Sequence, residues 1–267
     1  MKTSLFVSVL ATGCMLCVDA AWAAERDQAC PPSVIERIGR VLELDHFKPR
    51  DDEGIVVSSA CKAWPMDSQL LIAAVAYDQG EESRKSLFLA VIRVGDGLVV
   101  ASHRGSIGED AVVSIYGGSL RIDTARYELS PGVRAFGLDI ASGTPGPRCA
   151  EGGLGPTRSL YVVEKEHIRP VLEEVWLSHW WFVKGSNPAC SPVETEDDEI
   201  EQAGFSIAVG AGTTNGFKDL VITGTSRVPE GHKARRKPLK VRLRYDGTRY
   251  PNEALVDDIL RWRSDTP

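Results

Sequence analysis

Few side chains in this 267-residue chain stand at the spacings that catalysis requires. No GxSxG elbow, HExxH helix or phosphate-binding glycine loop occurs in the sequence. Carboxylates gather at 51–53 and 194–201, but a glycosidase needs two of them held roughly 5–10 Å apart across a cleft. The histidines are scattered, at His46, His103, His167, His179 and His232. We expect a non-catalytic protein without a cofactor. The alternatives are an enzyme acting on glycans and a module that binds glycans or calcium.

Cationic residues near the C-terminus suggest binding. In the stretch KVRLRY, Lys240, Arg242 and Arg244 alternate with apolar residues, as in a strand with one solvated face. Arg235 and Arg236 precede this stretch. We expect these cations to steer an acidic partner toward the protein.

Three polar segments, 142–158, 184–202 and 226–238, interrupt the strand-like pattern. Loops of this length in a compact domain are usually functional or disordered. The first segment is rich in Gly and Pro and carries Arg148 and Arg158. We expect these two arginines to pair with carboxylates in the cleft of a partner enzyme.

Aromatic residues gather in WLSHWWFV, 176–183, which could stack against sugars. In a strand, Trp176, Trp180 and Phe182 share one face and Trp181 takes the other. We interpret the stretch as core packing with one exposed ring.

The N-terminus resembles an export signal. An apolar run from Leu5 to Val18 is followed by Ala21-Trp22-Ala23, which predicts a signal peptide over 1–23 and a periplasmic protein. The string LATGC is the alternative, because cleavage before Cys14 would give an outer-membrane lipoprotein facing the periplasm. The formal net charge of −6 argues against a nucleic acid partner.

Cysteine usage agrees with export. Two of the six cysteines lie in the leader, and the others are Cys30, Cys61, Cys149 and Cys190. An even number in an exported chain favours two disulfides, for which three connectivities exist. We expect the pairing that is local in sequence, Cys30 with Cys61 and Cys149 with Cys190.

Hydrophobic periodicity predicts a mostly β chain with a short helix at each end. Residues 30–45 have helical spacing, with Ser33 and Glu36 as a capping box. Short strands with turns every eight to twelve residues follow, which is typical of a sandwich, barrel or propeller. The stretch 252–262 places Leu255, Ile259 and Trp262 on one helical face. We expect a helical segment over 24–54 and one β domain over 55–267.

One loop carries a resemblance. GTTNGFKDLVITGTS, 212–226, resembles the FG-GAP repeat of integrin-like β-propellers, whose calcium loop ends in Asp-Leu before a strand. Asn215 and Asp219 match ligand positions, whereas Ala211 and Thr213 replace the first two ligands. The resemblance implies a propeller-like antiparallel meander with a degenerate loop. Because calcium takes six to eight oxygens, we expect no metal there and only a turn at Asn-Gly.

A second resemblance covers roughly residues 55–250. The stretches IDTARYELSPGVRAFGLDIASG, SLYVVEKEHIRPVLEEV and VRLRYDGTRY are similar to exported proteobacterial proteins. They also resemble periplasmic immunity proteins of Xanthomonas-type bacteria, which antagonise peptidoglycan-cleaving toxins of a secretion system and can act as lysozyme inhibitors. The resemblance implies an inhibitor whose partner is a cognate toxin or another cell-wall hydrolase.

Overall fold

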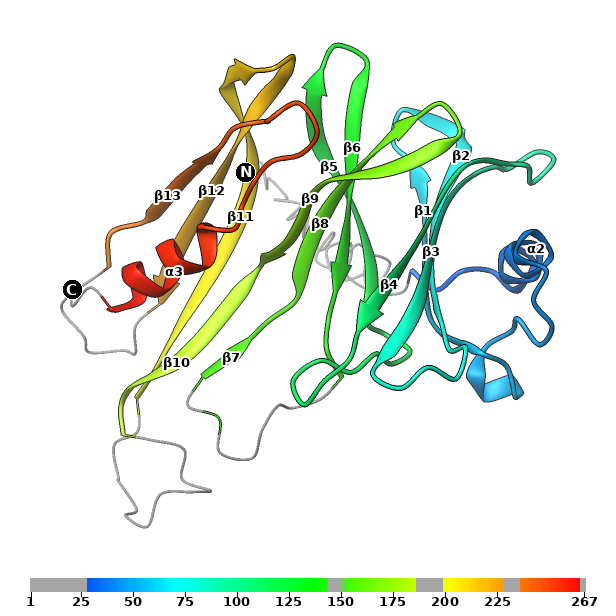
Figure 1. The fold of residues 1–267 in the computed structure, drawn as a ribbon, viewed down its shortest axis with the longest axis horizontal. Helices are drawn as coiled ribbons and strands as arrows, with labels where there is room; N and C mark the ends of the chain where they lie inside the picture. The colour runs from blue at the N-terminus through cyan, green and yellow to red at the C-terminus, as the bar shows by residue number, and fades with distance from the viewer. Residues whose placement is uncertain (1–27, 144–149, 151, 186–198, 228–235, 265–267) are drawn as a thin grey trace, which may run out of the picture.

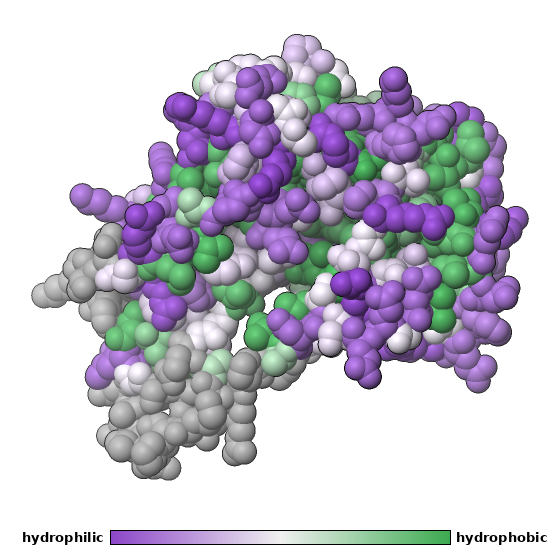
Figure 2. Space-filling view, in the orientation of Figure 1, coloured by the Kyte–Doolittle hydropathy of each residue, from purple (hydrophilic) through white to green (hydrophobic). Residues whose placement is uncertain are grey.

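Two β-sheets and two α-helices make up the described part of the chain (Figure 1). The computed structural model describes residues 28–143, 150, 152–185, 199–227 and 236–264. No helix within these ranges is both long enough and apolar enough to cross a membrane. The surface seen in Figure 2 is mostly hydrophilic, with smaller hydrophobic patches between the polar side chains.

The larger sheet has eight strands in the order β1-β2-β3-β4-β9-β8-β6-β5 and curls into a nearly closed barrel (Figure 1). Its neighbouring strands are antiparallel except β4 and β9, which meet in a short parallel contact between Ser102 and His167. The strands are β1 (Val56–Trp64), β2 (Asp67–Tyr77), β3 (Arg84–Arg93), β4 (Val99–Gly108), β5 (Leu120–Ser130), β6 (Val133–Ile140), β8 (Thr157–Glu164) and β9 (His167–Trp176).

Apolar side chains from all eight strands fill the inside of the barrel. Alternation along each strand explains this arrangement. On β8, for example, Tyr161 points into the barrel core, whereas Leu160 and Val162 point outward into a second core.

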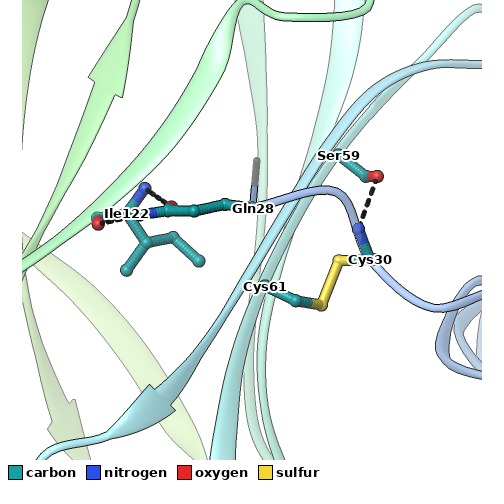
Figure 3. Close-up of a disulfide and its surroundings, with 5 residues drawn as sticks. All are labelled: Gln28, Cys30, Ser59, Cys61 and Ile122. Atoms are coloured by element: carbon teal, nitrogen blue, oxygen red, sulfur yellow. Dashed lines mark hydrogen bonds between the residues drawn. A yellow bond between two sulfur atoms is a disulfide. The ribbon is translucent and has the colours of Figure 1, made fainter. Parts of the chain in front are cut away.

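The seam between β1 and β5 is closed by side chains and by the segment that precedes the first helix (Figure 3). The Gln28 amide bonds both backbone groups of Ile122, donating at 3.1 Å and accepting at 2.7 Å. On the other side, the Cys61 N–H donates to the Gln28 carbonyl at 2.6 Å. The disulfide between Cys30 and Cys61 fixes this segment and confirms the first of the expected pairings. Cys149 and Cys190 lie outside the described residues.

The second sheet has the order β13-β12-β11-β10-β7 and leans against the outer face of the barrel. Its strands are β7 (Gly152–Leu154), β10 (Ser178–Lys184), β11 (Glu199–Thr214), β12 (Phe217–Arg227) and β13 (Leu239–Leu243). Its inner face packs on outward-facing residues of β5, β6, β8 and β9, which together form a second core.

Two helices cover apolar surface, as the sequence predicts. Helix α2 (Pro32–Leu42) packs on the outer face of β2 and β3, and helix α3 (Leu255–Ser264) buries Leu255, Ile259 and Trp262 in the second core. The expected capping box is wrong, because α2 begins after Pro31 and no side chain caps it. Proline suits this first turn, where its missing N–H loses no helical hydrogen bond.

The mostly β class is confirmed, but a propeller is not shown. The described strands form a barrel-like sheet of eight and a sheet of five, and not radial four-stranded blades. The short parallel contact between β4 and β9 joins two antiparallel meanders into one barrel, a pairing between segments far apart in the chain. Sequence patterning did not single out β1 or β7 as strands.

Candidate functional site

The basic strip, which we define as Lys240, Arg242 and Arg244, comprises two residues of the edge strand β13 and the residue that follows its end. All three side chains are exposed and alternate with Val241, Leu243 and Tyr245, as the sequence predicts. Strand geometry spaces them roughly 7 Å apart on one face. Because β13 ends the second sheet, one side of its backbone pairs with no other described strand.

The neighbours of the basic strip on the sheet are uncharged and short. Lys240 pairs across the ladder with Thr223, and Arg242 pairs with Val221. One strand further, Ser206 and Ala208 occupy the same face of β11 and are exposed. The cationic side chains are therefore longer than the side chains beside them on the sheet. No carboxylate lies directly across from Lys240 or Arg242.

Arg158, expected to contact a partner from a loop, lies instead on β8 inside a polar network. Its guanidinium donates to both carboxylate oxygens of Asp139, at 2.5 and 2.7 Å, and lies 2.7 Å from Asp123. It also donates to the Tyr127 hydroxyl at 2.9 Å. Burial raises the pKa of Tyr127, which stays protonated and donates to Asp123. These bonds occupy Arg158, so we do not propose it as a partner contact.

Arg236 also forms its contacts inside the protein. Its guanidinium forms a two-pronged ion pair with Glu201, both bonds measuring 2.9 Å, and donates to the Trp262 carbonyl at 2.7 Å. Its charge also lies 5.8 Å from the ring centre of Trp181 and 5.7 Å from that of Trp262. Burial alone would raise the pKa of Glu201, but the bonds and charge of Arg236 hold that pKa below its ordinary value. Arg148 and Arg235 lie outside the described residues.

The loop that resembles a calcium site forms a tight turn. Asn215 and Gly216 have φ of 48° and 89°, the left-handed values that a two-residue hairpin of this kind requires. Asp219 is only 3% exposed and accepts a hydrogen bond from the Thr214 hydroxyl at 2.7 Å. The expected turn is confirmed, and the absence of calcium binding stays a prediction. Within the described ranges, no three His, Cys, Asp or Glu side chains gather where they could hold a metal ion.

The aromatic stretch 176–183 buries the face that was expected to be exposed. Trp181 is buried in the second core, whereas Trp180 and Phe182 are half-buried on the other face of β10. The chain breaks its strand at Leu177, between β9 and β10, so Trp176 does not share the face of Trp180. It lies against His179 with ring centres 5.8 Å apart.

His179 should make the folded state sensitive to acid. The side chain is buried between Trp176 and Trp181, and its Nδ1 has no hydrogen-bond partner within the described structure. Burial, assisted by the charge of Arg263, lowers its pKa to about 4. The unfolded chain takes up this proton near pH 6.5, the folded protein only near pH 4. The free energy of unfolding is therefore not reduced by His179 above pH 6.5, and it falls as the pH drops from 6.5 toward 4.

Chemical denaturation between pH 7.5 and 4 measures this effect. His179→Phe removes the titrating group while keeping an aromatic ring between the two tryptophans. We expect the variant to lose less stability than the wild type over this pH range. Equal losses in the two proteins would contradict the assignment to His179.

Comparison of the chain with protein-family models, curated proteins and solved structures finds no match.

Proposed function

We propose that this protein is a non-catalytic periplasmic inhibitor that binds a peptidoglycan-degrading enzyme through the basic strip of β13. The exposed row of Lys240, Arg242 and Arg244 on a sheet edge is the observation that carries the proposal. It is a local concentration of positive charge on a chain whose formal net charge is −6. Such asymmetry steers an acidic partner to one face.

The chemistry of the partner class fits this surface. Glycoside hydrolases act through a pair of carboxyl groups flanking the scissile bond, so their clefts carry negative charge. The long cationic side chains of the basic strip extend beyond their short neighbours on the sheet and can reach into such a cleft. The resemblance expected from the sequence implies the same class of partner.

Edge protection is the competing explanation of the basic strip. Charged residues on an edge strand prevent sheets from joining edge to edge, and a charge of either sign serves that purpose. Reversing the three charges therefore separates the two roles. The triple variant K240E/R242E/R244E keeps a charged edge and removes the attraction for an acidic cleft.

Association kinetics with a lysozyme-type muramidase test the proposal. We expect the association rate constant of the mature chain to fall at least about tenfold between low and high salt. We expect a similar fall at low salt for K240E/R242E/R244E. The control R40E/R104E/K165E changes the net charge equally at exposed sites on other elements and should have much less effect. Equal effects of the two triple variants on the association rate constant would show that the basic strip is not part of the interface.

A further inference from the structure

A pocket in the mouth of the barrel is separate from the basic strip. It opens where the β1–β2 turn meets the β5–β6 hairpin, and Figure 1 shows both turns at the same end of the barrel. Its volume is about 540 Å³, within the range of roughly 300–1,000 Å³ typical of small-molecule sites. Strand residues of the barrel line it together with Met66 and Gly132 of the two turns.

The walls of the pocket combine apolar surface with cations. Trp64 and Met66 lie on the β1–β2 side, and Val163 contributes from β8. Met66 is 71% exposed, an unusual position for a large apolar side chain with no role. Thioether side chains adapt to ligands of different shape. Arg126 and Arg134 come from β5 and β6.

Arg134 forms no ion pair with any described residue. Glu128 lies directly across the ladder from it, but the two side chains do not form an ion pair within the described structure. Its Nη2 instead donates to the Thr124 carbonyl at 2.7 Å. Its Nε–H is buried and has no acceptor among the described residues. The rest of the Arg134 side chain lies on the pocket wall, where an anion would pair with its charge.

We propose that this pocket binds a small organic anion with an apolar or aromatic body. The anionic group lies against Arg134 and Arg126, and the apolar body lies against Trp64, Met66 and Val163. Glu128, also on the pocket wall, opposes the anion. This site does not depend on the inhibitory role of β13, because its residues come from other strands.

Two fluorescent probes of similar shape test the role of charge. 8-Anilinonaphthalene-1-sulfonate carries a sulfonate, and N-phenyl-1-naphthylamine is the same aromatic body without it. We expect the sulfonate to bind one molecule per chain, about tenfold or more tighter than the neutral probe. Equal affinity for both probes, or binding of several sulfonate molecules per chain, would overturn the proposal.

Exposed residues of the wall give variants with opposite expected signs. Because exposed charges contribute modestly, R126Q should weaken sulfonate binding about two- to fivefold, and E128Q should strengthen it by a similar factor. Neither substitution should alter binding of the neutral probe. R104Q removes an exposed cation on β4 outside the pocket and should have no effect. Shifts of the same sign in R126Q and E128Q would contradict the proposal. These variants leave Arg134 and its support of the hairpin intact.

Discussion

Replacing Arg236 with alanine is expected to lower the free energy of unfolding by about 3–5 kcal/mol, because the buried carboxylate of Glu201 loses both of its hydrogen bonds to the Arg236 guanidinium. The side chain of Glu201 is 1% exposed and that of Arg236 is 6% exposed, so water does not reach the charge that remains. The substitution also removes the cation between the rings of Trp181 and Trp262 and its bond to the Trp262 carbonyl. Urea denaturation measures the loss.

A paired substitution separates the buried charge from the loss of packing. Replacing both partners, Arg236→Met with Glu201→Leu, leaves no lone buried charge, and we expect it to recover most of the stability lost in Arg236→Ala. The substitution Arg227→Ala removes an exposed arginine at the end of β12 and should change stability little. A loss of less than about 1 kcal/mol in Arg236→Ala would show that the ion pair does not hold the second sheet and α3 together.

The second large effect is expected at the barrel seam. Replacing both Cys30 and Cys61 with serine removes the bridge across a sequence separation of 31 residues. Disulfides of this kind contribute about 2–4 kcal/mol. The loss should be accompanied by faster hydrogen exchange at the Ile122 amide, because the segment that places Gln28 against β5 is no longer fixed.

Gln28→Ala isolates the seam contacts with the disulfide intact. It removes both hydrogen bonds to Ile122 and should cost about 1–2 kcal/mol, at roughly 1 kcal/mol for each bond. The Ile122 amide should again exchange faster. Unchanged exchange in both the cysteine and the Gln28 variants would show that the segment around Gln28 does not hold β5 in place.

Features that local chemistry dictates could be predicted from the sequence. The periodicity of Leu255, Ile259 and Trp262 predicts the buried face of α3, and Asn215-Gly216 predicts its hairpin turn. Alternation in KVRLRY predicts the exposed row on β13. Each of these signals spans only a few residues, so no distant contact is needed to interpret it.

Features that depend on distant partners could not be predicted. Arg158 and Arg236 look like surface cations beside polar loops, but their carboxylate partners lie 19 and 35 residues away in sequence. The face of Trp181 depends on the strand break at Leu177, which no turn residue marks. The barrel seam includes a contact between Gln28 and Ile122, which are 94 residues apart in sequence. The pocket combines two turns that hydrophobic patterning treats as unrelated.

Clearing of a peptidoglycan suspension by a lysozyme-type muramidase tests the proposed inhibition most directly. We expect the protein, added in excess as residues 24–267, to slow clearing, and the control R40E/R104E/K165E to slow it equally. K240E/R242E/R244E, confirmed as folded by its unfolding midpoint, should protect at least about tenfold less well at equal concentration. Full protection by K240E/R242E/R244E would contradict the role of β13. Clearing of the suspension by residues 24–267 alone would contradict the non-catalytic account as a whole.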